Sequence, residues 1–307
     1  MRGARLRPAA FILLLALVAT PLLMPISCSA QLPQFDERKA YEHLLRQVAF
    51  GPRAPGTPGH RACLEYLTME LEKYADKVTQ QKFQHTFGPE RRTVVMSNII
   101  ANFWSEKTKR VLLCAHWDTR PWADHDPDPA NRATSIPGAN DGASGVAVLL
   151  EIARLLKAHE PRFGVDIVLF DGEDCGQEGD DRTWAIGSRH FAESKDPRYR
   201  PLFGILLDMV GDADLEIYIE QHSQESAPDV VSLVWARAAE LGVTEFIRRP
   251  KYALVDDHVP LLRAGIRCID IIDYDYPYWH TLADTPDKCS AESLGKVGRV
   301  VLSVLYR

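Results

Sequence analysis

The chain has 307 residues, of which 46% are hydrophobic and 25% are charged, and its formal net charge is −6. This length and composition are sufficient to bury one large α/β core. The acidic balance argues against nucleic acid or an anionic membrane surface as a partner, because binding of that kind needs a surplus of Lys and Arg to displace counterions. We therefore expect a single globular domain and no nucleic-acid partner.

The N-terminus has the pattern of a secretory signal peptide. Residues 1–7 are rich in Arg, residues 9–24 are mostly apolar, and small residues follow. This pattern predicts a signal peptide over residues 1–30, and the apolar run is short for a membrane-spanning helix. We expect export, with a periplasmic or secreted domain over residues 31–307. In the alternative, Cys28 is lipidated and the protein is a lipoprotein anchored to a membrane only by its lipid.

Five cysteines follow the predicted signal peptide. An odd number in an exported chain allows at most two disulfides and leaves one free thiol, and no CxxC spacing indicates a thiolate metal site. Two of these cysteines lie in apolar, strand-like runs, where we expect them to be buried. The five are Cys63, Cys114, Cys175, Cys268 and Cys289, of which Cys114 and Cys268 are those two.

Helical and strand-like segments alternate along the chain. Apolar residues at helical spacing predict helices over 36–48, 60–74, 141–156, 230–241 and 291–305, with shorter ones from Ile186 and near 259–262. Apolar runs bounded by turns predict strands over 78–83, 94–96, 99–103, 111–115, 165–170, 203–207 and 268–272. The alternation predicts an α/β fold, with a mostly parallel central sheet flanked by helices on both faces.

Two loops have compositions that suggest more than a connection. The Gly-rich turn 138–145 holds Asp141 at a predicted helix start, either as a helix N-cap or as a carboxylate fixed for function. The long loop 119–137 contains the acidic run 124–128. A calcium site is one interpretation of that run, but it lacks the Gly and distal Glu of a known calcium loop, so we favour a solvated turn.

Polar residues of metal-ligand types lie where several predicted strands end, and others lie in loops able to reach that edge. In parallel sheets, sites form beyond the carboxyl ends of the strands. Clustered carboxylates are costly unless a cation or shared protons compensate, and carboxylates together with imidazoles suit a catalytic zinc ion. The strand-end residues are His116, Glu173, Asp174 and Asp208, and the loop residues are Asp141 and His280.

The order of these motifs resembles that of the zinc aminopeptidase family with a single α/β domain. The resemblance covers essentially the whole chain after Arg38, and it rests on 116–118, 138–142, 171–174, 187–190, 207–209, 279–281 and 284–285. In the di-zinc aminopeptidase branch it implies one ion on His116 and Asp208, a second on Asp174 and His280, Asp141 bridging them and Glu173 as the base. In the glutaminyl cyclase branch it implies one zinc ion held by Asp141, Asp174 and His280. All ligands of both schemes are present.

Two features favour the cyclase branch. Asp256-Asp257-His258 stands where the aminopeptidases usually show Ser-Asp-His, and Trp279 directly precedes His280. In that branch the resemblance implies that Trp279 lines the substrate pocket, with Trp184 as a second pocket aromatic. It also implies that Asp208 and Asp256 share a proton. One departure is Asp174, which stands where many relatives have Glu and therefore has a shorter reach toward zinc.

The resemblance thus implies that the protein cyclises the N-terminal glutamine of peptides to pyroglutamate and releases ammonia, with Glu173 as the proton carrier. The alternative is a di-zinc aminopeptidase that hydrolyses N-terminal residues. A non-catalytic exported binding protein on the same scaffold would lack a ligand or the base, and none is missing. We expect one zinc ion, with two as the alternative, a monomer, and peptides or proteins with N-terminal Gln as partners.

Overall fold

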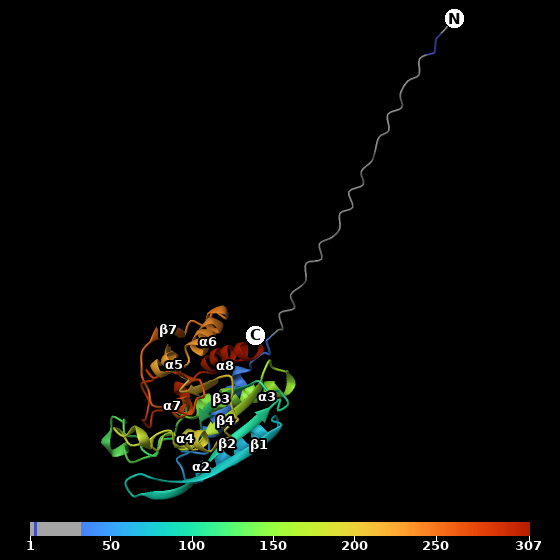
Figure 1. The fold of residues 1–307 in the computed structure, drawn as a ribbon. Helices are drawn as coiled ribbons and strands as arrows, with labels where there is room; N and C mark the ends of the chain where they lie inside the picture. The colour runs from blue at the N-terminus through green and yellow to red at the C-terminus, as the bar shows by residue number, and fades with distance from the viewer. Residues whose placement is uncertain (1–2, 5–31) are drawn as a thin grey trace. The chain divides into compact units, whose positions relative to one another are not determined.

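A six-stranded sheet is the framework on which the rest of the chain is placed in this computed structural model (Figure 1). The structure describes residues 3–4 and 32–307, and residues 32–307 form one compact unit. The predicted signal peptide and Cys28 lie outside the described residues, apart from residues 3 and 4. The strands, in spatial order, are β1 (Lys77–Phe87), β2 (Arg92–Phe103), β4 (Gly164–Phe170), β3 (Arg110–His116), β5 (Gly204–Asp208) and β8 (Cys268–Ile272).

The sheet is mostly parallel, as the sequence predicts. Strands β4, β3, β5 and β8 run parallel, whereas β1 and β2 form a long antiparallel hairpin whose second strand is also antiparallel to β4. The prediction of separate strands over 94–96 and 99–103 was wrong, because β2 continues through Ser97 and Asn98. Both side chains are buried, and the Asn98 amide donates to the Gly187 carbonyl at 2.8 Å, so this polar pair does not interrupt the strand.

Helices cover both faces of the sheet (Figure 1). Helices α1, α2, α3 and α8 share one hydrophobic core with the sheet, while α4 and α7 pack on the opposite face. Their bounds are α1 (Glu37–Val48), α2 (Pro58–Glu72), α3 (Ala143–Ala158), α4 (Ile186–Ser194), α5 (Gln221–Ser226), α6 (Pro228–Glu240), α7 (His258–Arg263) and α8 (Ala291–Tyr306). Each predicted helix is present, within a few residues of its expected ends.

The two cores follow from the alternation of side chains along buried strands. In β3, Leu113 and Ala115 point to the core that contains α3, whereas Leu112 and Cys114 point to the core that contains α4 and α7. Successive residues of the strand point to opposite faces, and both faces are covered, so residues of both sets are apolar. The strand therefore has the continuous apolar run seen in the sequence.

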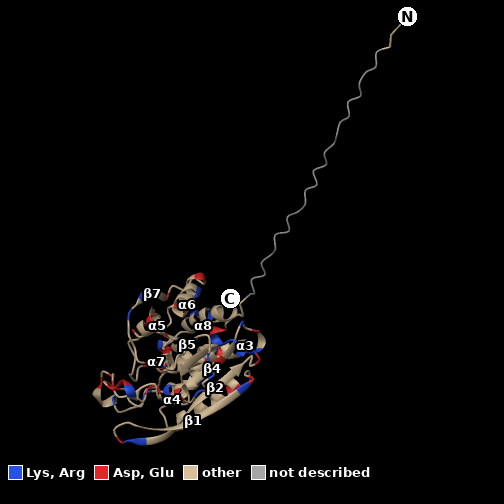
Figure 2. Ribbon diagram, in the orientation of Figure 1, with Lys and Arg blue, Asp and Glu red and all other residues tan. Residues whose placement is uncertain are grey.

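A small second sheet and one helix were not predicted. Strands β6 (Ile217–Ile219) and β7 (Phe246–Pro250) pair parallel to each other, and α5 is only six residues long. Elements this short carry too few periods of apolar residues to be recognised from sequence. Lys and Arg are interspersed with Asp and Glu along the described ribbon (Figure 2).

The five described cysteines are all buried and none is in a disulfide. This agrees with the prediction that Cys114 and Cys268 are buried. Within residues 3–4 and 32–307, no helix combines the length and apolar character that crossing a membrane requires.

The close contact between α3 and β5 depends on Gly145. A Cβ atom on Gly145 would lie 2.1 Å from the Leu207 carbonyl oxygen and 3.1 Å from the Ala115 Cβ. These neighbours belong to two central strands, so they cannot move without shifting the sheet edge that carries His116 and Asp208.

We therefore expect Gly145→Ala to destabilise the protein, although helix propensity alone would favour alanine by about 1 kcal/mol. Overpacking against a strand backbone should outweigh that gain and lower the free energy of unfolding by roughly 1 kcal/mol or more. Chemical denaturation measures this change. Lys157→Ala, at an exposed position of the same helix, is the control. An equal or higher stability for Gly145→Ala would contradict the packing argument.

Candidate metal centre

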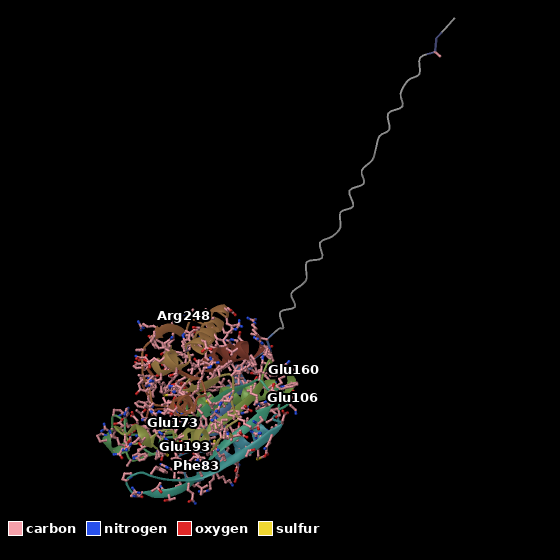
Figure 3. The ribbon with its side chains drawn as sticks, viewed as in Figure 1. Phe83, Glu106, Glu160, Glu173, Glu193 and Arg248 are labelled. Atoms are coloured by element: carbon pink, nitrogen blue, oxygen red, sulfur yellow. The ribbon has the colours of Figure 1, made fainter. Side chains whose placement is uncertain are left out.

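The carboxyl ends of three adjacent strands bring the first site residues together. Strand β3 ends at His116 and β5 ends at Asp208, while the turn after β4 carries Glu173 and Asp174. All four side chains are buried or nearly so. Figure 3 labels Glu173, which lies well away from Arg248 on β7.

Asp141 reaches the same edge from the Gly-rich turn before α3. Gly138 and Gly142 have φ angles of +66° and +92°, and a Cβ on Gly142 would lie 2.4 Å from the Asp118 carbonyl oxygen. The helix starts at Ala143 with Gly142 as N-cap, so the interpretation of Asp141 as a helix cap was wrong. Its carboxylate is instead available to the site.

The buried carboxylate of Asp284 fixes the backbone of that turn. It accepts hydrogen bonds from the Asn140 N–H at 2.8 Å and from the Asp141 N–H at 3.1 Å, and the Tyr276 hydroxyl donates to it at 2.8 Å. The sequence motif contains Asp284, but the sequence alone gave it no role. A buried aspartate that anchors a distant loop leaves no periodic signal.

Asp141, Asp174 and His280 converge with ligand-like spacing. The His280 Nε2 lies 3.0 Å from the Asp174 Oδ1 and 3.6 Å from the Asp141 Oδ2. Two ligands bound at about 2.0–2.1 Å to one tetrahedral zinc ion lie roughly 3.3–3.5 Å apart. The Oδ2 atoms of Asp141 and Asp174 are buried and have no hydrogen-bond partner. This donor set therefore fits a zinc ion.

Outer contacts orient the members of this trio. The other ring nitrogen of His280 lies 3.6 Å from the Asp124 Oδ1, in the arrangement by which a carboxylate orients a metal-ligating histidine. The buried Arg120 guanidinium donates to the Asp124 carboxylate at 2.8 Å and to the Asp174 carbonyl at 3.0 Å. Arg120 thus connects the loop after β3 to two of the three predicted ligands, a role that the sequence did not reveal.

His116 and Asp208, the candidates for a second ion, also meet Asp141. The His116 Nε2 lies 3.1 Å from the Asp208 Oδ1 and 3.2 Å from the Asp141 Oδ1. Against the effect of burial, the charge of Asp208 raises the pKa of His116 well above its usual value. The structure therefore brings both predicted ligand sets together around the shared carboxylate of Asp141.

Asp118 ties the two halves of the site to each other. Its carboxylate accepts from the Glu173 N–H at 3.1 Å and the Asp174 N–H at 3.3 Å, and it lies 3.5 Å from the His116 Nδ1. These contacts fix the directions in which the adjacent Glu173 and Asp174 side chains leave the backbone. Asp118 belongs to the motif 116–118, but no function was predicted for it from the sequence.

Burial and like charges make Glu173 suited to carry a proton. Burial and the charges of Asp174 and Asp256 raise the pKa of the Glu173 carboxyl well above its usual value. Burial and the charge of Asp208 raise the pKa of Asp256 to about 6. A carboxyl group whose pKa lies closer to neutral is a better general acid or base than an ordinary surface carboxylate.

A cavity of about 330 Å³ exposes these groups to a ligand. It is lined by the trio, by Glu173, Asp208 and Asp256, and by the predicted aromatics Trp184 and Trp279. The Trp279 and Trp184 rings stack on His280, with centroids 3.9 Å and 6.0 Å from its ring. The remaining lining is largely apolar and includes Leu254, Ile272 and Tyr274.

The acidic run in loop 119–137 is only partly solvated, because His125, Pro127 and Asp128 are exposed whereas one aspartate is not. Asp126 is buried and accepts from the Leu282 N–H and the Asn131 side-chain amide, both at 3.0 Å. It therefore binds the loop to the segment that carries His280. The expectation of a solvated turn therefore fails for Asp126 and holds for the exposed residues, because a carboxylate that anchors two loops has the same local sequence as one that faces water.

Comparisons with known proteins identify the family of the chain. The model of peptidase family M28 matches residues 98–305. The crystal structure of a glutaminyl cyclase from Bacteroides thetaiotaomicron, bound to N-acetylhistamine, has a TM-score of 0.87 and 41% sequence identity, and the match covers 90% of this chain and 99% of that one. A Zn-dependent exopeptidase from Parabacteroides distasonis has a TM-score of 0.87 and 40% identity over 90% and 100% of the two chains.

More distant relatives include a glutaminyl-peptide cyclotransferase of Drosophila melanogaster, which is 26% identical over 261 residues, or 76% of this chain and 70% of that protein. The family model spans more than half of the sequence, and the bacterial structures match nearly all of the described unit. The chain therefore belongs to peptidase family M28, in the branch that includes the bacterial glutaminyl cyclases.

Proposed function

We propose that the protein cyclises the N-terminal glutamine of peptides or proteins to pyroglutamate, with release of ammonia. The observation that carries this proposal is the convergence of Asp141, Asp174 and His280 beside Glu173 in one cavity. The similarity to bacterial glutaminyl cyclases over nearly the whole chain supports the same reaction. We further propose that the protein acts after export, as a monomer, with lipidation at Cys28 as the alternative to free secretion.

We propose that one zinc ion is held by Asp141, Asp174 and His280. A zinc ion held there would act as a Lewis acid toward the side-chain amide carbonyl of the substrate. The second set, His116 with Asp208 and Asp141, meets equally well and favours a di-zinc aminopeptidase as the other candidate function. Burial and the charge of Asp208 raise the pKa of the additional carboxyl of Asp256, and we propose that the two groups share a proton. This proton would compensate the pair without a second cation, which favours the cyclase.

Glu173 moves the proton in the proposed reaction. Its carboxylate takes a proton from the substrate's α-amine, and the amine nitrogen forms a bond to the side-chain carbonyl carbon. The bond between that carbon and the amide nitrogen breaks, and Glu173 returns the proton to the departing ammonia. Because nucleophile and electrophile belong to one residue, a pocket that holds the side chain curled back captures most of the orientation benefit.

The other cavity residues position the substrate and exclude water. Asp208 and Asp256 steady the leaving amide through their shared proton, and Trp279 and Trp184 cover the metal side of the cavity. Exclusion of water matters because a water molecule that reached the polarised carbonyl would hydrolyse it instead.

A pair of substrates distinguishes the two candidate functions. The purified protein should release ammonia from a dipeptide that starts with Gln and should leave leucine anilide intact, because cyclisation needs the side-chain amide. Ammonia release and anilide cleavage are both followed by absorbance. Cleavage of the anilide without ammonia release would reverse the assignment and favour the aminopeptidase.

Glu173→Gln should abolish turnover and leave the zinc content unchanged. The amide keeps the size of the side chain but cannot take a proton, so we expect a loss of about 10²–10⁴-fold in kcat. Steady-state kinetics and elemental analysis of the same preparation give both quantities. A variant that turned over at close to the wild-type rate would rule out Glu173 as the base.

His116→Ala separates the one-ion and two-ion schemes. If zinc is held by Asp141, Asp174 and His280, the variant should keep the metal content of the wild type, whereas Asp174→Ala should lose it. Elemental analysis after dialysis measures zinc per chain. Loss of one of two ions in His116→Ala would favour the di-zinc scheme.

A further inference from the structure

The proposed catalytic cavity is lined by carboxylates without any balancing cation. Among the described residues that line it, none is Lys or Arg. Most of the lining carboxylates are buried and face one another or the predicted metal position. Only Asp181 is exposed to solvent. The lining carboxylates are Asp141, Glu173, Asp174, Asp181, Asp208 and Asp256.

Asp181 stands at the mouth of the cavity. It begins the short 3-10 turn Asp181–Thr183, directly before Trp184, whose ring stacks on His280. The turn therefore places a carboxylate next to one aromatic wall of the pocket, on the side open to solvent. It belongs to the loop after β4 that also carries Glu173 and Asp174.

Nearby cations do not neutralise this carboxylate. Arg182, the adjacent residue, pairs with Asp180 at 2.8 Å. Arg120, whose guanidinium carbon lies 4.6 Å from the Trp184 ring centroid, pairs with Asp124. Across residues 32–307, no ion pair includes Asp181, whereas its two neighbours Asp180 and Arg182 satisfy each other. The negative charge of Asp181 is thus available to a bound ligand that extends out of the cavity.

A peptide that leaves the cavity on the Trp184 side passes this position. Its first residue fills the cavity with the side-chain amide toward the trio, and an extended chain advances about 3.3–3.6 Å for each further residue. The second residue therefore emerges at the mouth, where Asp181 lies.

We propose that Asp181 makes the enzyme prefer peptides in which Lys or Arg directly follows the N-terminal glutamine. This inference rests on the proposed function and names the substrate class that the site favours. The interaction is an ion pair in water at the rim of the site, so it adds about 1.5- to 5-fold to kcat/KM rather than deciding whether turnover occurs.

The experiment compares three amidated tripeptides that begin with Gln and carry Lys, Ala or Glu at the second position. Wild-type protein should turn over the Lys peptide about 1.5- to 5-fold faster than the Ala peptide, in kcat/KM, and the Glu peptide more slowly. Asp181→Asn should reduce the ratio of Lys to Glu toward one. The control Asp196→Asn removes an equal charge from an exposed position outside the cavity lining and should leave the ratio unchanged.

The dependence of the Lys-to-Glu ratio on ionic strength is a second test. If Asp181 had a purely structural role, this ratio would not change with salt. Raising salt from about 0.01 M to about 1 M shortens the Debye length from ~30 Å to ~3 Å, so the wild-type ratio should fall while that of Asp181→Asn stays flat. Equal ratios in wild type and Asp181→Asn, with all three peptides turned over, would overturn the Asp181 proposal alone. Failure of wild type to release ammonia from any of the peptides would overturn the proposed function and this inference together.

Discussion

Repulsion among buried carboxylates is the constraint on which the site depends. Asp141, Asp174, Glu173, Asp208 and Asp256 line one cavity and are all nearly inaccessible to solvent. Burying such a cluster of carboxylates costs several kcal/mol of folding free energy for each unpaired charge, unless a cation or shared protons compensate. A divalent cation at the trio is the simplest compensation that also leaves Glu173 free to carry a proton.

The scaffold keeps these groups in place through contacts that lie behind the cavity. Asp118 holds the backbone of Glu173 and Asp174, Asp284 holds the turn of Asp141, and Arg120 connects the loop after β3 to the Asp174 backbone. Each of these contacts joins segments that are distant in sequence, across the carboxyl edge of a sheet whose strands are buried on both faces. The rigid sheet therefore fixes the positions of the site residues, and the loops at its carboxyl edge carry most of them.

Apolar periodicity was enough to predict the parallel strands and the longer helices, because those signals extend over many residues. It did not reveal β6, β7 or α5, which are too short, nor the continuity of β2 through two buried polar residues. The sequence predicted that Asp174 at a strand end and Asp141 and His280 in loops would meet at the carboxyl edge of the sheet, where a parallel sheet gathers such residues, and the family resemblance grouped these three as ligands. The roles of Asp118 and Arg120 were not predicted, since their partners are identified only by the tertiary fold.

Diffraction from crystals of the zinc-loaded protein, recorded on both sides of the zinc absorption edge, tests the central claim most directly. We expect one anomalous peak, within bonding distance of Asp141, Asp174 and His280 and away from His116. A peak bonded to His116 and Asp208, with or without a second one, would contradict the single-ion site, and the absence of any peak at the trio would contradict the proposed chemistry as a whole.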